Sequence, residues 1–532
     1  MTAHVLPTPT GRDDLIDRLS QSHPYDVAVI GGGATGLGVA LDASARGFSV
    51  VLVESHDFAK GTSSRSTKLV HGGVRYLAQG NVALVREALH ERSLLLANAP
   101  HLAQPLAFVM PSYRWWEAPF YGLGLKLYDA LAGKAGLGRT EFLSRDETVT
   151  CLPTVRAEGK QGRLRGGVKY WDGQFDDARL ALALARTAAQ RGALLVNYCA
   201  ATELLHHDGK LVGFCARDQE SGRALNIKAG CVVNATGVWV DDMRRLDGQA
   251  TGRKALPIVA PSQGIHAVVD RAFLPGHHAM LVPKTADGRV LFAVPWMGKT
   301  LLGTTDTPRQ DLDREPMAFK DELDFILRES ARYLTRAPTQ ADIKSLWVGL
   351  RPLVKSTEED VGSTKGLSRE HTIAVSNSGM VTVTGGKWTT YRAMAEDVLE
   401  QCANAGLIPR RPVVTAHLAL VGAQPSSQSL SKAPGLHLYG TEAIDVLALG
   451  LPHDKDLGGG VTSAMVRFAV RCEYARTVED VLARRSRLLF LDAALASKLA
   501  DDVGRLIAEE TGTDPQVQAF KALCIRYLTC PN

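Results

Sequence analysis

The stretch Tyr25-Asp-Val-Ala-Val-Ile-Gly-Gly-Gly-Ala-Thr-Gly36 decides the fold of this chain. Its first six residues form an apolar, β-branched run, which predicts a buried strand. Residues 37–46 carry small and apolar side chains at helical spacing, and residues 48–54 predict a second strand. A strand, a glycine turn, a helix and a second strand within roughly thirty residues predict the start of a parallel sheet.

The glycine turn predicts a dinucleotide site. In the spacing GxGxxG the first glycine permits a tight turn, the second lets a pyrophosphate approach the backbone, and the third lets helix and strand pack closely. The start of the helix offers free N–H groups to the phosphates. An acid at the end of the second strand suits ribose hydroxyls and argues against NADP, but it does not separate NAD from FAD. The predicted contacts are Gly31, Gly33, Ala34, Thr35, Gly36 and Glu54.

Bulk composition limits the classes of function. The 532 residues exceed one ordinary core and predict two or three domains. With 61 basic and 56 acidic residues, the formal net charge is only +5. This excess suits an anionic substrate or an acidic membrane surface and is too small for a nucleic-acid partner.

Cysteine usage and hydropathy indicate the compartment. The eight cysteines are scattered without a CxxC pair, which predicts reduced and mostly buried thiols in a cytoplasmic protein. Residues 1–24 lack the apolar run of a signal peptide, and no stretch is long enough to span a bilayer. Any membrane contact is therefore expected to be peripheral. No metal-ligating constellation is visible.

The chain divides into four segments by composition. Residues 1–24 are expected to be an extension, with the first structured element at Tyr25. Residues 25–420 are assigned to an α/β, Rossmann-like domain with an interleaved substrate-binding domain, for which short strands over about 255–310 predict an antiparallel sheet. The Ser-, Pro- and Gln-rich segment 421–435 reads as a linker. Residues 436–532 are expected to form a C-terminal α-helical domain.

Helix signals are clear at several positions. Helices are predicted over 81–97 and 177–191, and a capping box at Thr477 and Asp480 predicts a helix that runs to Leu491. The basic side chains of Arg484, Arg485 and Arg487 are expected to form a solvated or subunit-contact face.

Two later glycine motifs favour FAD over NAD. Cys231-Val-Val-Asn-Ala-Thr-Gly237 is an apolar strand that ends in Ala-Thr-Gly, a motif of two-domain flavoproteins. Thr384-Gly-Gly-Lys387 ends another strand before a predicted helix, whose N-terminus would stabilise negative charge on a reduced flavin. Each motif alone could be an ordinary turn, but their order together is specific.

From Tyr25 to Arg392 the sequence resembles the FAD-dependent glycerol-3-phosphate dehydrogenases, within the D-amino-acid-oxidase-like flavoproteins. The stretches that carry the resemblance are Thr62–Leu77, Tyr170–Asp172 with Asp176–Arg179, Val233–Gly237, Pro295-Trp296 with Gly303–Asp306, Gly349–Leu353 and Gly385–Arg392. Phe468–Arg485 resembles the C-terminal helical domain of the family.

The resemblance implies a site and a reaction. It implies oxidation of sn-glycerol 3-phosphate to dihydroxyacetone phosphate by FAD, with a membrane quinone as electron acceptor. Further cofactor contacts would be Thr62, Ser63, Ser64, Lys68, Leu69, Ala235, Gly237, Gly385, Gly386, Lys387, Trp388 and Thr389. The substrate side would be lined by His71, Arg75, Tyr76, Thr305, Arg351 and Lys387.

The residue types suggest roles in this chemistry. Histidine titrates near neutrality, so His71 is the first candidate for the base that takes the hydroxyl proton, with Lys387 second. Arginine binds phosphate oxygens in pairs, so Arg75 and Arg351 are the candidates for the phosphate, with Arg351 also counted as catalytic. Alternatively, His71 only orients its loop and Arg351 forms a structural ion pair.

Other acceptors and partners stay open. Residues 115–137 combine aromatic and basic side chains, which favours a helix in the interface on the inner face of the cell membrane, although an ordinary packed helix pair explains the pattern equally well. The rival functions are an oxygen-reducing oxidase of the same substrate, an amine or 2-hydroxy-acid oxidoreductase, and a flavin-binding structural or sensor protein. A homodimer is a further open assembly.

Overall fold

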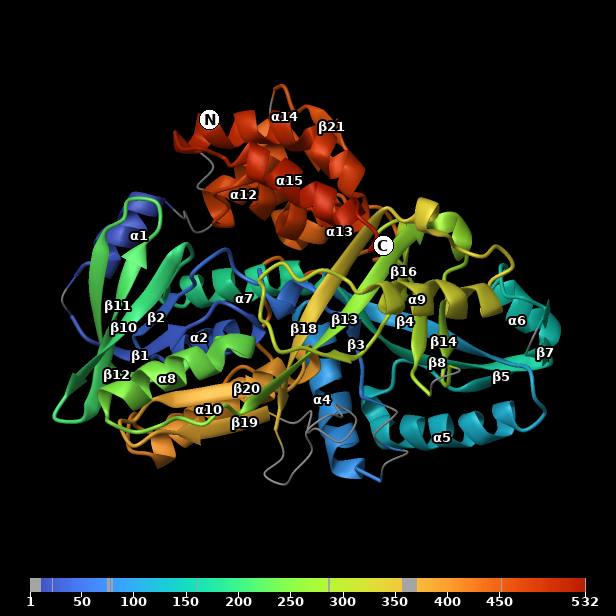
Figure 1. Cartoon of the computed structure of the whole chain (residues 1–532), viewed down its shortest axis with the longest axis horizontal. Helices are drawn as coiled ribbons and strands as arrows, with labels where there is room; N and C mark the ends of the chain where they lie inside the picture. Colours follow the sequence, from blue (N-terminus) through green and yellow to red (C-terminus); the bar gives the residue numbers. More distant parts are fainter. Residues whose placement is uncertain are drawn as a thin grey trace.

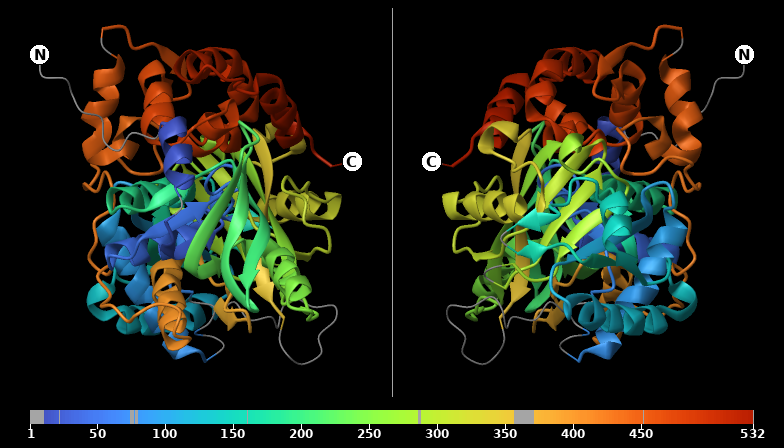
Figure 2. Two further views of the ribbon diagram at one scale, coloured as in Figure 1. Left: turned by 90° about the vertical axis from the view of Figure 1, so that its left-hand side faces the viewer. Right: turned by 90° about the vertical axis from the view of Figure 1, so that its right-hand side faces the viewer.

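The fold is built on two large β-sheets, and a layer of C-terminal helices covers one side of both (Figures 1 and 2). The computed structural model describes residues 11–21, 23–73, 77, 80–159, 161–285, 288–355, 371–450 and 452–531. Both sheets are assembled from segments far apart in the sequence, as the colours of Figure 1 show. The α/β fold class expected from the sequence is confirmed.

The first sheet has the strand order β10-β11-β12-β1-β2-β9, with β20 beside β12 and β19 beside β20. Its strands are β1 (Tyr25–Ile30), β2 (Val50–Val53), β9 (Leu194–Val196), β10 (Cys199–His207), β11 (Lys210–Asp218), β12 (Ala224–Asn234), β19 (His371–Val375) and β20 (Val381–Gly385). β1 pairs in parallel with both β2 and β12, and β12 pairs in parallel with β20. The predicted parallel sheet is therefore confirmed.

The register aligns the carboxyl ends of the central strands. Ile30 at the end of β1 lies opposite Asn234 on β12 and Val53 on β2. The glycine turn, Glu54 and Ala235 follow these three residues directly. They therefore meet at one edge of the sheet, where open α/β sheets bind ligands.

Helices flank this sheet. α2 (Ala34–Ala45) packs against α7 (Asp177–Gln190) and α10 (Tyr391–Asn404), and α8 (Val240–Ala250) packs against β10. α7 confirms the helix predicted over 177–191 and is capped by Asp176. The expectation that structure begins at Tyr25 is wrong, because α1 (Arg12–Leu19) precedes it. α1 buries Leu15, Ile16 and Leu19 on one side, which explains why it is held on the surface of the domain.

The second sheet has the order β17-β13-β16-β15-β14-β4-β8-β3, with β18 beside β13 and β5 beside β8. Its strands are β3 (Leu69–Val70), β4 (Ala103–Ser112), β5 (Glu141–Ser144), β8 (Gly166–Phe175), β13 (Val259–Asp270), β14 (Ala279–Val282), β15 (Leu291–Trp296), β16 (Lys299–Gly303), β17 (Thr307–Pro308) and β18 (Ser345–Val354). The antiparallel sheet predicted near 255–310 is present. Four of its ten strands come from residues 69–175, joined through the parallel pair β4–β14. The sequence did not show this, because pairing between distant strands leaves no local pattern.

Four helices accompany the second sheet: α4 (Val82–Asn98), α5 (Glu117–Ala132), α6 (Arg145–Cys151) and α9 (Lys320–Tyr333). α4 confirms the helix predicted over 81–97, and the side chain of Asn81 caps it by accepting from Leu84 N. Short pieces complete this part: β6 (Glu158–Gly159), β7 (Gly162–Arg163), η1 (Thr62–Ser64), η2 (Gly133–Ala135), η3 (Gly237–Trp239), η4 (Arg271–Phe273), η5 (Gln340–Asp342) and η7 (Trp388–Thr390).

The C-terminal layer consists of η8 (Leu436–Glu442), α11 (Ala443–Gly450), β21 (Asp456–Gly458), β22 (Val461–Thr462), α12 (Ser463–Cys472), the π-helix η9 (Asp480–Arg485), α13 (Leu488–Leu491), α14 (Ala493–Thr511) and α15 (Val517–Leu528). The capping box at Thr477 is present. The predicted helix to Leu491 is broken at Arg487, which has a positive φ of 66°. This layer shares one apolar core with the second sheet, including Trp296, Trp347 and Phe490.

The expected solvated face of three arginines is wrong. Arg484, Arg485 and Arg487 are all buried, at 2% exposure or less, and they bind carboxylates of the first domain. Their sequence pattern gave no sign of this, because the partners Asp57 and Asp177 lie more than 300 positions earlier.

The cysteines are mostly buried, as the sequence predicted. All eight cysteines are free, and five are buried, namely Cys199, Cys231, Cys402, Cys472 and Cys524. Within the described ranges, no helix is both long and apolar enough to cross a bilayer.

Candidate functional site

The glycine turn has no room for side chains. Gly31 has a φ of +112°, and a Cβ there would lie 2.6 Å from the carbonyl oxygen of Ala235. A Cβ on Gly36 would lie 1.9 Å from the carbonyl oxygen of Gly31. Gly33 is the N-cap of α2 and brings no side chain to cap it. The start of α2 therefore presents backbone to its surroundings, as a phosphate-binding turn requires.

Glu54 is fixed beside this turn. One carboxylate oxygen accepts from Gly32 N at 2.7 Å, and the other accepts from Ser55 Oγ at 3.1 Å and from His56 N at 2.9 Å. The side chain is only half-buried. An acid held in this way at the end of β2 suits hydrogen bonds from ribose hydroxyls.

The Ala-Thr-Gly motif and the Gly-Gly-Lys motif meet next to the turn. Ala235 N donates to Ile30 O at 2.9 Å, which places the first motif against β1. The hydroxyl of Thr384 donates to Gly237 O at 3.3 Å, which joins the two motifs. Gly237, Gly385 and Gly386 all have positive φ, so these bends favour glycine.

The Ser/Thr-rich loop, residues 62–68, spans the remaining side of the site. Ser63 Oγ accepts from Ala34 N at 2.9 Å, and Ser63 O accepts from Trp388 Nε1 at 2.8 Å. Farther along, His71 N donates to Thr389 Oγ1 at 3.3 Å. Four segments that are distant in sequence therefore surround one place: the glycine turn, residues 62–71, residues 235–237 and residues 385–389. Many of their residues keep partial solvent exposure: Gly33, Ala34, Thr35, Thr62, Ser63, Gly237, Gly385, Gly386 and Lys387.

Lys68 supports this loop from inside the protein. Its side chain is fully buried, and Nζ donates to Asp177 Oδ2 and to Ser64 O, each at 2.7 Å. Nζ also lies 4.7 Å from the centroid of Trp347. Burial lowers the pKa of Lys68 against the opposing effect of Asp177. The side chain of Lys68 is thus engaged beneath the loop, and Leu69 next to it is likewise buried in β3.

Arg351 is oriented on β18. Its guanidinium donates to Asp306 Oδ1 at 3.2 Å, to Thr304 Oγ1 at 3.1 Å and to Thr305 O at 2.9 Å. The side chain keeps 25% exposure. The planar group of Arg351 is therefore held in one orientation, with Asp306 as its ionic partner.

The other substrate-side candidates have different positions. Thr305 is fully buried, and its hydroxyl donates to Glu322 Oε1 at 2.9 Å and accepts from Ile265 N at 3.1 Å. Its side chain is thus engaged within the sheet. His71 and Lys387 are half-buried, and Lys387 is the N-cap residue of η7. Arg75 and Tyr76 lie outside the described residues.

His266 on β13 was missed by sequence reasoning. Its ring stacks on Trp347 at 4.2 Å, and Nε2 lies 2.9 Å from Thr67 Oγ1 of the Ser/Thr-rich loop. Burial, followed by the charges of Lys68 and Arg351, lowers the pKa of His266 well below its usual value. A neutral imidazole thus joins the loop to the second sheet. A lone histidine in an apolar strand carries no local signal for this role.

Tyr128 was also missed. Its hydroxyl accepts from Gly72 N at 2.8 Å and donates to Asp172 Oδ2 at 3.1 Å, while Arg92 donates to Asp172 Oδ1 at 2.8 Å. All three side chains are buried. They fix the backbone directly after His71. The aromatic character of residues 115–137 indicated a surface helix but not this inward contact.

Comparisons with known proteins agree with this geometry. Residues 26–392 match the FAD dependent oxidoreductase family, and residues 413–518 match the C-terminal domain of alpha-glycerophosphate oxidase. The chain is 38% identical to a mitochondrial glycerol-3-phosphate dehydrogenase of Arabidopsis thaliana, over 96% of this chain and 87% of the relative. It is 38% identical to the mitochondrial glycerol-3-phosphate dehydrogenase of Rattus norvegicus, over 94% of this chain and 72% of the relative.

A solved structure is similar throughout. The glycerol-3-phosphate dehydrogenase of Bacillus halodurans, complexed with FAD, superposes with a TM-score of 0.77 at 30% identity, over 97% of this chain and 98% of the other. The chain belongs to the FAD-dependent glycerol-3-phosphate dehydrogenase family. The cofactor of this family member is FAD, as expected from the sequence.

The described residues fit the cofactor of the family. A Cβ at Gly31 or Gly36 would collide with the protein's own backbone, so the tight turn and the close helix–strand packing of a dinucleotide-binding fingerprint are both present. The start of α2 and Glu54 would hold the phosphates and the ribose of FAD. The segments 62–64, 235–237 and 385–389 would hold the flavin half.

Proposed function

We propose that this family member oxidises sn-glycerol 3-phosphate to dihydroxyacetone phosphate. The observation that supports this most directly is the place of Arg351. Gly349 packs on the Ser/Thr-rich loop so closely that a Cβ would lie 2.5 Å from Arg65 O. Arg351 is two residues farther along β18, so its side chain leaves the same face of the strand. This places an oriented guanidinium on the face of β18 that meets the Ser/Thr-rich loop, and such a cation suits the phosphate of a phosphorylated alcohol.

The proposed reaction divides its tasks among the side chains. Oxidation of a secondary alcohol removes a hydride from carbon and a proton from the hydroxyl. FAD, when bound, accepts the hydride. Arg351 contributes the positive charge of its oriented guanidinium to the phosphate, with Arg75 and Tyr76 as further proposed contacts. His71 takes the hydroxyl proton, and Lys387 is the second candidate for that base.

Anaerobic mixing tests the proposed substrate. The FAD-loaded enzyme is mixed with glycerol 3-phosphate, and the flavin absorbance near its long-wavelength band is followed. Bleaching with glycerol 3-phosphate, but not with glycerol, an amine or a 2-hydroxy acid, is the expected result. Bleaching by one of the latter two compounds alone would replace this function with the corresponding oxidoreductase.

We further propose that the electrons leave to a membrane quinone and that α5 docks on the membrane surface (Figure 1). The outward side chains of Trp116, Phe120, Leu123 and Leu127 recur at three- and four-residue spacing and are 38–74% exposed. Trp115, just before the helix, is 77% exposed. An apolar stripe with Lys126 and Lys134 nearby suits a helix that lies in the interface of an anionic membrane.

Vesicle binding tests the docking surface. The enzyme is expected to sediment with anionic phospholipid vesicles, and the double variant Phe120→Ser, Leu123→Ser is expected to remain in the supernatant. Equal sedimentation of both proteins would refute docking through α5. Peroxide release in air, compared with reduction of a soluble quinone, separates quinone from oxygen as acceptor.

A further inference from the structure

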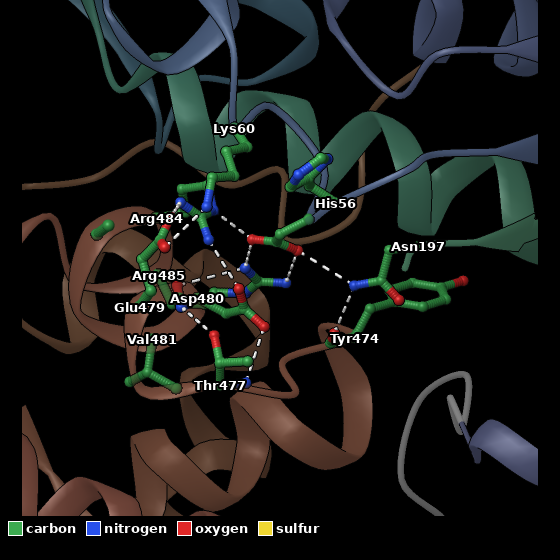
Figure 3. A network of polar contacts seen from close by, with 12 residues as sticks. His56, Lys60, Asn197, Tyr474, Thr477, Glu479, Asp480, Val481, Arg484 and Arg485 are labelled. Carbon is green, nitrogen blue, oxygen red and sulfur yellow. Dashed lines mark hydrogen bonds and ion pairs between the residues drawn. The ribbon is translucent and has the colours of Figure 1, made fainter. Parts of the chain in front are cut away.

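A buried network of charges joins the C-terminal layer to the first sheet (Figure 3). Its centre is Asp57, which follows β2 and is fully buried. Asp57 accepts from Arg484 Nε and from both terminal nitrogens of Arg485. The bond from Arg485 Nη2 to Asp57 Oδ1 is 3.0 Å long. Asn197 Nδ2 adds a fourth bond at 3.2 Å. Figure 3 shows Arg484 and Arg485 rising from the C-terminal layer toward the segment that carries His56 and Lys60.

A second ring of groups balances the charge. Arg484 also donates to Glu479 Oε1 and to Asp480 Oδ1, each at 2.7 Å. Lys60 Nζ donates to Glu479 Oε2 at 2.8 Å. The acids Asp57, Glu479 and Asp480 thus face the bases Lys60, Arg484 and Arg485. The network is neutral overall, as a buried cluster must be to be tolerated.

The segment held by this network is also the one that shapes the cofactor turn. On one side of Asp57, His56 N donates to the carboxylate of Glu54 at 2.9 Å. On the other side, Ala59 N donates to Gly32 O at 2.9 Å, with a φ of 61° at Ala59. The backbone around Asp57 is therefore bonded both to the proposed ribose acid and to the glycine turn.

Stability alone gives little reason for such a network. Burying four charged groups, Asp57, Asp480, Arg484 and Arg485, costs desolvation energy, and apolar side chains of similar volume often stabilise a protein as well or better. The charged groups instead fix the orientation of the two segments, because the hydrogen bonds to Asp57 form only when the donors approach its carboxylate at the right angles. A π-helical turn presents the two arginines, and such turns occur frequently at functional sites.

We propose that Arg484 and Arg485 are positioning residues for FAD. They act through Asp57, and the C-terminal layer thereby holds the segment from Glu54 to Ala59 in the conformation that binds the nucleotide half of FAD. The proposal rests on the assignment of Glu54 and the glycine turn to FAD. Loss of the arginines is expected to weaken the binding of FAD more than it weakens the fold.

The test compares two buried arginines that join the same two parts of the protein. Arg485→Met removes bonds to Asp57, whereas Arg186→Met removes the bonds of α7 to Glu442 of the C-terminal layer. Arg186 and Glu442 are both buried, so the two variants lose similar interactions, but only the first touches the segment after β2. The readouts are the Kd of FAD, from quenching of flavin fluorescence on titration of the apoprotein, and the midpoint of urea unfolding.

Arg485→Met is expected to raise the Kd of FAD at least tenfold and to speed FAD dissociation. Arg186→Met is expected to lower the unfolding midpoint with less than a threefold change in Kd. Equal changes of Kd in both variants would show that the network only tethers the domains and would overturn the proposal. If Arg485→Met does not fold, Arg485→Lys and Asp57→Asn replace it, with the same expected order. A Gly31→Ala variant that binds FAD normally would refute the turn assignment itself, which distinguishes the two failures.

Discussion

Lys68 donates to Asp177 at 2.7 Å, and neither side chain is exposed to solvent. The other oxygen of Asp177 accepts from Arg487 Nη2 at 3.1 Å. Ser66 N and Ser66 Oγ also donate to Asp177, at 3.1 and 2.7 Å. A single carboxylate at the start of α7 thus binds the Ser/Thr-rich loop and the C-terminal layer together.

Lys68→Met is expected to destabilise the protein by about 3–5 kcal/mol, because it leaves part of a buried carboxylate unpaired. The measurement is the midpoint of urea unfolding followed by tryptophan fluorescence. The matched control is Lys521→Met, which removes an exposed pair with Asp501, also 2.7 Å long. That change is expected to cost about 1 kcal/mol or less. Similar losses in both variants would contradict the supporting role of Lys68.

Gly31→Ala is expected to raise the Kd of FAD at least about tenfold, or about 1.4 kcal/mol, because the new Cβ would collide with Ala235 O. The measurement is the flavin content after purification, followed by titration of the apoprotein. Gly124→Ala on α5 is the control, since its Cβ would meet nothing within 4 Å. It is expected to leave FAD binding unchanged and to stabilise α5 by about 0.5–1 kcal/mol. A Gly31→Ala enzyme with full flavin would contradict the prediction.

Arg351→Lys is expected to lower kcat/KM for glycerol 3-phosphate about 100-fold, or about 2.7 kcal/mol, since an ammonium cannot reproduce the planar fork. Steady-state kinetics with an artificial electron acceptor measure the effect. Arg336→Lys changes an exposed arginine that pairs with Asp342 and is the control, expected to retain its kinetics. Unaltered kinetics in Arg351→Lys would leave Arg351 as a structural ion pair.

The buried ring of His101 is expected to make stability depend on pH. Burial, followed by the charge of Arg179, lowers the pKa of His101 to about 3. Unfolded His101 takes up a proton as the pH falls below its ordinary value of about 6.5, while folded His101 stays neutral until about 3. The free energy of unfolding should therefore decrease as the pH is lowered from about 6.5 to about 3. This group contributes at most about 1.4 kcal/mol per pH unit.

Unfolding midpoints of the FAD-loaded enzyme between these two pH values measure this dependence. His101→Gln should flatten the dependence of the unfolding midpoint on pH relative to the unchanged protein, because the glutamine side chain does not bind a proton in this range. His207→Gln, at an exposed position, should leave the profile as it is. Parallel profiles for the protein and the His101 variant would contradict the prediction.

Local signals in the sequence explain what could be predicted. The glycine turn, the capping box at Thr477 and Asp480, and the β-branched run at Tyr25–Ile30 all act over a few residues. Their physical causes, namely steric freedom and hydrogen bonds to nearby amides, are contained in the local sequence. The dinucleotide turn and the α/β class follow from these signals.

Side chains whose roles depend on distant partners could not be assigned in this way. Thr305 was predicted to line the substrate side, and the structure adds that its hydroxyl donates to Glu322 inside the sheet. Lys68 was predicted to contact the cofactor, and the structure adds that its Nζ donates to Asp177 beneath the loop. For both residues, the direction of the side chain depends on which face of the strand or loop packs against the rest of the protein. Strand pairing across the second sheet determines that face.

The sequence by itself determined that a glycine turn of the dinucleotide-binding type follows the strand at Tyr25–Ile30 and to which family the chain belongs. Only the tertiary structure decided that Arg485 reaches Asp57, 428 positions earlier, and that Arg351 is held by Asp306. The physical reason is that burial and partners, which distinguish a solvated charge from a positioned one, exist only after distant segments have packed together.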